Sequence, residues 1–160
     1  MGLTKADVAA LGRKQQRPVR AEGELLAVFV PGKVVNPLNA SAWMWQKRSR
    51  LAKQWKERVA LALLEDYRAL FRFGNEGSRR PKRVTFLART WNTLDTDGLA
   101  ASIKPLRDAL IECGVIHSDA PGSGHEFVYA QTIDRARRGV EIRVRPVSAP
   151  AVAGAAGAAP

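Results

Sequence analysis

The sequence predicts one α+β domain, in which a small mixed β-sheet carries two main helices on one face, in the order β-α-β-α-β-β. Four short apolar or alternating runs are typical of strands. Two longer stretches repeat apolar residues every three or four positions, as amphipathic helices do. With 160 residues, 46% of them hydrophobic, the chain can bury a core without disulfides. The single cysteine, Cys113, excludes an intramolecular disulfide.

The first half of the domain holds two predicted strands and one helix. Residues 25–30, LLAVFV, form an apolar run between a glycine and a proline, which favours a buried strand. From residue 48 to residue 70 the apolar positions repeat with helical spacing, and residues 74–78, GNEGS, predict a turn that ends this helix. Residues 83–90, RVTFLART, predict the second strand.

The second half holds a helix and the last two strands. Apolar residues recur with helical spacing from Leu99 to Leu110, Asp97 suits the helix N-cap, and Gly114 suits the C-terminal cap. Residues 127–133 and 140–147 predict strands joined by a basic turn. The last run alternates apolar and charged residues, so one of its faces should be buried.

The termini predict appendages to this domain. Residues 1–23 form a basic extension, expected to be partly disordered with a short helix near residues 5–11. Residues 24–147 form the folded domain, and residues 148–160 form an Ala/Gly/Pro tail that should be disordered. No apolar run approaches the ~18 residues that span a bilayer, and no apolar signal core is present, so we expect a cytoplasmic protein without a membrane partner.

Positive charge is concentrated in one part of the chain. The net charge is +11, and residues 42–90 carry 13 Lys/Arg against 4 Asp/Glu. Such an excess favours a polyanionic partner, nucleic acid above an anionic membrane, because the basic helix lacks the strongly apolar face and the flanking anchors that a membrane-surface helix prefers. The four tryptophans suit core positions or base stacking equally well. The residues expected to hold DNA phosphates are Lys47, Arg48, Arg50, Lys53, Lys56, Arg79, Arg80 and Lys82, with Arg135, Arg137 and Arg138 as further candidates.

An acidic cluster interrupts this basic chain. Asp95 and Asp97 lie two residues apart before the second helix, so an extended backbone would point both carboxylates to one side. Lys104 follows Asp97 by seven residues, which is about two helical turns, and therefore shares its helix face. Asp119 comes after the helix, in a loop that can fold back toward the helix start. Three carboxylates and a lysine around one point would form a Mg²⁺ site for phosphodiester chemistry.

Plainer interpretations of the same residues stay open. The paired acids can cap the helix or lie in a solvated turn, and Lys104 can form a helical ion pair with Asp108. His117 and His125 match no zinc motif and are expected to be loop histidines. Cys113 suits the helix-end core better than a nucleophile, because no activating group is placed near it in the sequence.

These residues resemble the RusA family of crossover (Holliday) junction endodeoxyribonucleases, small proteins common in prophages. The family pattern is an Asp-x-Asp-Asn-Leu entry into a helix, a Lys-Pro-Leu, an Asp-Ala-Leu, a glycine and an Asp-Asp pair. The element order is similar over residues 25–147, and the similarity is sharp over residues 94–120. The matching segments are Asp95-Thr96-Asp97-Gly98-Leu99, Lys104-Pro105-Leu106-Arg107-Asp108-Ala109-Leu110, Gly114 and Ser118-Asp119.

The resemblance implies a Mg²⁺-dependent endonuclease, with Mn²⁺ as a possible substitute, that resolves four-way DNA junctions by paired symmetric nicks in recombination and repair. It implies a homodimer on branched DNA without a small-molecule cofactor. It places the metal on Asp95, Asp97 and Asp119, and Lys104 near the scissile phosphate. The alternative is a catalytically inactive nucleic-acid-binding protein of the same fold, because Gly98 and Ser118 replace an Asn and an Asp of the family pattern.

Overall fold

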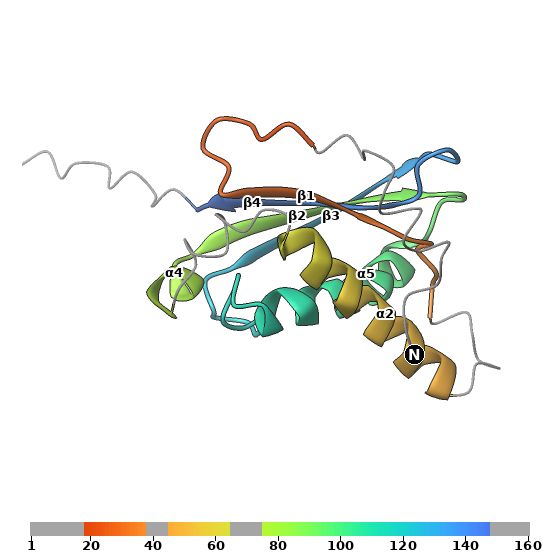
Figure 1. Cartoon of the computed structure of the whole chain (residues 1–160), viewed down its shortest axis with the longest axis horizontal. Helices are drawn as coiled ribbons and strands as arrows, with labels where there is room; N and C mark the ends of the chain where they lie inside the picture. Colours follow the sequence, from red (N-terminus) through yellow and green to blue (C-terminus); the bar gives the residue numbers. More distant parts are fainter. Residues whose placement is uncertain (1–17, 38–44, 65–74, 148–160) are drawn as a thin grey trace, which may run out of the picture.

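A four-stranded sheet forms the centre of the protein (Figure 1). The computed structural model describes residues 18–37, 45–64 and 75–147. The strand order is β1-β4-β2-β3, with β2 and β3 parallel and the other neighbours antiparallel. The strands are β1 (Leu26–Pro31), β2 (Lys82–Thr90), β3 (Glu126–Ile133) and β4 (Gly139–Pro146). The helices are α2 (Trp45–Leu64), α4 (Asn75–Arg79) and α5 (Thr96–Glu112).

The two long helices, α2 and α5, lie on the same face of the sheet, which confirms the predicted α+β architecture (Figure 1). The predicted alternation of the last strand is also confirmed, because Val140, Ile142 and Val144 are buried in the core. On β2 every second residue faces this core, since a strand turns successive side chains to opposite faces. The helices complete the core with Trp55, Val59, Leu63, Leu99, Ile103, Leu106 and Leu110.

Helix α5 connects the two parallel strands β2 and β3, and parallel neighbours need such a crossover. The helix ends as predicted at Gly114, whose φ of +73° is the left-handed conformation that glycine adopts freely. The Val115 N–H donates to the Leu110 carbonyl at 2.9 Å and closes the end of the helix. The crossover places the start of α5 just beyond the end of β2, where the candidate site lies.

Some element boundaries differ from the sequence expectation. Of the turn predicted at residues 74–78, the described residues 75–78 belong instead to the short helix α4, and α2 begins at residue 45 rather than residue 48. The expected end of that first helix, the helix near residues 5–11 and the tail at residues 148–160 lie outside the described residues. Among the residues that are described, no helix is long and apolar enough to cross a membrane.

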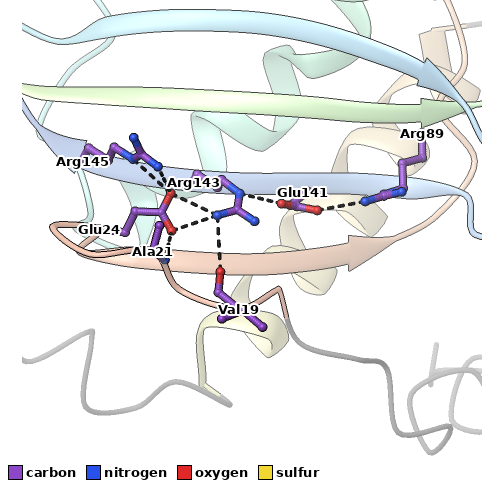
Figure 2. Close-up of polar contacts among 7 residues, drawn as sticks. All are labelled: Val19, Ala21, Glu24, Arg89, Glu141, Arg143 and Arg145. Carbon is purple, nitrogen blue, oxygen red and sulfur yellow. Dashed lines mark hydrogen bonds and ion pairs between the residues drawn. The ribbon is translucent and has the colours of Figure 1, made fainter.

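The sheet face opposite the helices carries a chain of ion pairs, and Figure 2 shows it running from the segment before β1 to the end of β2. The buried carboxylate of Glu24 accepts from Arg143 at 2.9 Å and from Arg145 at 2.7 Å. Glu141 then bonds Arg143 at 2.6 Å and Arg89 at 3.1 Å. These pairs tie residues before β1 to β4 and β2.

Candidate functional site

The first two predicted acids lie together at the start of α5. Asp95 is the N-cap, and its Oδ1 accepts from the Gly98 N–H at 3.1 Å and from the Asn36 amide at 3.4 Å. Asp97 lies in the first helical turn, and both side chains are exposed. The predicted N-cap was Asp97, two residues too late, because the helix begins at Thr96. Both carboxylates thus lie at the positive end of the helix dipole, which favours anions.

Glycine at position 98 leaves room for this arrangement of Asn36 and Asp95. A Cβ atom there would lie 2.2 Å from Asn36 Nδ2 and 2.3 Å from Asp95 Oδ1, far inside van der Waals contact. Asn36 therefore occupies the space that a side chain at position 98 would take, and its amide lies beside Asp95.

Lys104 is exposed and forms the helical ion pair that the sequence left open. Its ammonium lies 3.1 Å from Asp108 Oδ1. It lies seven residues after Asp97, which is about 10 Å along the helix axis. The lysine is thus on the helix surface two turns from the paired acids and already has a carboxylate partner.

Asp119 lies away from the paired acids. Its carboxylate binds Arg107 Nη2 at 3.1 Å, and Arg107 Nη1 donates to the Tyr129 hydroxyl at 2.9 Å. Arg107 follows Asp97 by ten residues, or about 15 Å of helix. Within residues 18–37, 45–64 and 75–147, no three His, Cys, Asp or Glu side chains are grouped to hold a metal ion. The expected gathering of three carboxylates around one point is therefore not found, because Arg107 holds Asp119 beside the second half of α5.

The predicted phosphate-binding residues of α2 lie on its exposed surface. Lys47, Arg48, Arg50 and Lys53 are exposed, as are Arg79 and Arg80 around the end of α4. Lys56 is partly buried and forms an ion pair with Glu112 of α5. The hydrogen bond that Lys56 donates to Glu112 raises the pKa of Lys56, so this lysine stays charged. The exposed members of the set place positive charge on the protein surface.

Lys82 is the exception, and its prediction as a DNA contact was wrong. Its side chain is 1% exposed, and its ammonium donates to the carbonyl groups of Gly77 and Arg80. Burial lowers its pKa to about 8, and the charge of Arg80 contributes to the shift. The alternation along β2 could have indicated this burial, because Lys82, Val84 and Phe86 lie two residues apart and therefore face the same, core side of the strand.

The two histidines, as expected, lie in loops, but the fold also brings them together. His125 Nε2 lies 3.0 Å from His117 Nδ1, and the Lys82 N–H donates to His125 Nδ1 at 3.2 Å. Burial, with the charges of Lys82 and His117, lowers the pKa of His125. Neither histidine lies with a third side chain that could complete a metal site among the described residues.

A basic pocket lies beside the paired acids and was not predicted from the sequence. Its volume is about 630 Å³, and Lys33, Arg89, Trp91 and Arg138 line it at the end of β2. Asn36 lines the same pocket and bonds Asp95, so the pocket adjoins the acids at the start of α5. Of the three cations Lys33, Arg89 and Arg138, only Arg138 was predicted from the sequence as a phosphate contact. The other two were missed because the pocket combines three segments that are distant along the chain.

The described tryptophans differ in burial, and the sequence had left core packing and base stacking open for them. Trp55 is buried in the core, and Trp45 is exposed at the start of α2. Trp91 is 49% exposed and carries the guanidinium groups of Arg135 and Arg138 against its ring at 4.9 and 5.6 Å. Trp43 lies outside the described residues.

No protein-family model matches the chain, and no curated protein matches it significantly.

Proposed function

We propose that the protein is a structure-selective endodeoxyribonuclease that resolves four-way DNA junctions by paired symmetric nicks in recombination and repair. The observation that carries the proposal is the position of Asp95 beside a basic pocket, linked to it through Asn36. Cations in the pocket would hold a phosphate that the carboxylates alone would repel. Nuclease chemistry needs both kinds of charge next to one phosphate.

The proposed cofactor is Mg²⁺, with Mn²⁺ as a substitute, and its proposed ligands are Asp95, Asp97 and Asp119. Carboxylate oxygens suit this ion, and two of the three residues are neighbours at the start of α5. Asp119 does not fit this set while Arg107 holds it. A bound Mg²⁺ would supply an activated water and stabilise the negative charge that develops on the phosphate oxygens. We assign Lys104 to electrostatic stabilisation of the phosphate. For this role its ammonium must leave the ion pair with Asp108 and contact the substrate.

The proposed substrate is branched DNA, and the exposed cations of α2 support this choice. Lys47, Arg48, Arg50 and Lys53 lie on one exposed helix segment, well suited to a phosphate backbone. Paired nicks on opposing strands need two active sites, so we propose a homodimer. The proposed place of action is the cytoplasm of a bacterial or phage-infected cell.

A non-catalytic nucleic-acid-binding protein is the second candidate. One observation favours it: three of the four proposed catalytic side chains already have partners within the protein. Asp95 caps α5, Lys104 pairs with Asp108, and Asp119 pairs with Arg107. The basic surface would then bind DNA without cutting it.

Cleavage of a labelled four-way junction separates the two candidates. The wild-type protein is assayed with Mg²⁺ and with EDTA, beside Asp97→Asn and the surface control Glu126→Gln. If the protein is a nuclease, we expect metal-dependent nicks at symmetric positions, which are lost in Asp97→Asn and kept in Glu126→Gln. Tight junction binding without cleavage in Mg²⁺ or Mn²⁺ would establish the binding protein instead.

A further inference from the structure

The basic pocket at the end of β2 is larger than a phosphate needs. Its volume of about 630 Å³ lies within the range of ligand pockets and admits a nucleotide. Its lining combines the cations Lys33 and Arg138 with the apolar side chains of Val34, Val35 and Leu94. This combination suits a ligand with an anionic part and a flat apolar part.

Residues 134–138, between β3 and β4, form a turn that contains Arg138 and bonds Arg89, two of the pocket's cations. Asp134 Oδ1 accepts from the Ala136 N–H at 3.1 Å and the Arg137 N–H at 2.9 Å, and its Oδ2 accepts from Arg89 at 3.2 Å. The Gly32 N–H donates to the Arg138 carbonyl at 3.3 Å, so the turn is also fixed to the loop after β1. A guanidinium on an ordered turn loses less conformational entropy when it binds an anion.

Trp91 gives this pocket an aromatic wall. Arg135 and Arg138 lie against its ring, yet 49% of the residue remains exposed. Arg89, which lines the same pocket, keeps a buried Nε without a hydrogen-bond partner among the described residues. Exposed indole surface stacks readily on any nucleobase, and the neighbouring guanidiniums suit the phosphate attached to it.

We propose that this pocket takes one nucleotide of an unpaired DNA strand, with its phosphate at Lys33 and Arg138 and its base against Trp91. The inference rests on the proposed function, since the strand would belong to the branched substrate. It adds a recognition element next to Asp95 and Asp97, and it predicts a preference for junctions with unpaired bases at the cut. Charge on α2 alone would not discriminate in this way.

The test uses two fluorescent oligonucleotides of equal length in EDTA, one of thymidylate and one of abasic sites with the same phosphates. Anisotropy gives the affinity for each over a range of salt concentrations. We expect the wild-type protein to bind oligothymidylate about tenfold more tightly than the abasic strand. Trp91→Ala should remove this preference, and Trp91→Phe should keep most of it because phenylalanine also stacks.

Arg138→Gln tests the phosphate contact. Loss of one contact should reduce the slope of log affinity against log salt by about 0.7 for a single strand. The matched control is Arg83→Gln, which removes one positive charge from an exposed ion pair with Glu126 and should leave the slope unchanged. Circular dichroism and thermal unfolding confirm that each variant is folded.

Equal wild-type affinity for the two strands would overturn the inference, as would an unchanged slope in Arg138→Gln. Free thymidine 5′-monophosphate is the third arm, and binding of it as tight as that of the oligothymidylate would assign the pocket to free nucleotides instead. Junction cleavage is measured separately. Junction cleavage without a preference for oligothymidylate would refute only the proposed nucleotide-binding role of the pocket. A preference for oligothymidylate without junction cleavage would refute only the proposed nuclease activity.

Discussion

Replacing Glu24 with Gln should destabilise the protein through the ion-pair chain of Figure 2. The Glu24 side chain is 0% exposed, and it accepts hydrogen bonds from Arg143, Arg145 and the Ala21 N–H. Glutamine has nearly the same shape but no charge, and only its amide oxygen can accept from a guanidinium, because its NH2 group only donates. The substitution therefore leaves two arginines facing a neutral side chain.

The magnitude follows from the exposure of the partners. Removing one member of a fully buried ion pair costs about 3–5 kcal/mol, whereas an exposed pair contributes about 0–1 kcal/mol. Glu24 is buried, but the side chains of Arg143 and Arg145 are 29% and 53% exposed, so both can recover water contacts. We expect Glu24→Gln to lower the free energy of unfolding by about 2 kcal/mol at neutral pH.

The effect should also depend on pH in a defined direction. Burial alone would raise the pKa of Glu24, but the hydrogen bonds from Ala21, Arg145 and Arg143 outweigh it and hold the pKa below its ordinary 4.5. A carboxylate with a lowered pKa stabilises the fold above the ordinary value, and that stabilisation is lost as the pH falls through the folded-state pKa. The difference between wild type and Glu24→Gln should shrink below pH 4.5.

Urea denaturation at several pH values measures both effects, with Glu126→Gln as the matched control. Glu126 also bonds an arginine, Arg83 at 2.6 Å, but both side chains are about half exposed. Its substitution should cost less than about 1 kcal/mol. A Glu24→Gln variant as stable as the wild-type protein at neutral pH, or a difference that stays constant into acid, would refute this reasoning.

Three further stability predictions follow from the packing. Leu106→Ala should lower the free energy of unfolding by about 2–5 kcal/mol in urea denaturation, because Leu106 is fully buried against the sheet; a smaller loss would contradict this packing. Gly98→Ala should cost about 1–3 kcal/mol, because its Cβ would lie 2.2 Å from Asn36 Nδ2, and adding Asn36→Gly should recover part of the loss if this contact is the cause. Lys82 has a lowered pKa of about 8, so the wild-type protein should gain stability relative to Lys82→Met as the pH rises from about 8 to 10.5; parallel pH profiles would count against a buried ammonium.

Local patterns in the sequence were sufficient to predict most of the fold. The alternation in residues 140–147 predicted a half-buried strand, and Gly114 marked the end of α5, because both signals act within a few residues. The start of α5 was misplaced by two residues, since Asp95 and Asp97 are equally good caps by residue type.

The candidate site was less predictable because it depends on contacts between distant segments. Nothing near Asp119 in sequence indicates that Arg107 would bind it. Arg107 lies ten residues after Asp97 on α5, so this ion pair places Asp119 far along the helix from the paired acids. Asn36 contacts Asp95 across 59 residues of sequence, and Gly98 leaves the space in which this contact lies. The pocket combines the loops after β1, β2 and β3, which charge counting along the chain cannot group.

Digestion of a supercoiled plasmid that extrudes a cruciform tests the proposed nuclease most directly. Two symmetric nicks made during one binding event linearise the plasmid, whereas separate single nicks leave an open circle. The proposal predicts linear product with the wild-type protein in Mg²⁺, and intact plasmid with Asp97→Asn or in EDTA. Open circle as the main product, or an uncut plasmid that the protein binds tightly in Mg²⁺, would contradict paired cleavage at Asp95 and Asp97.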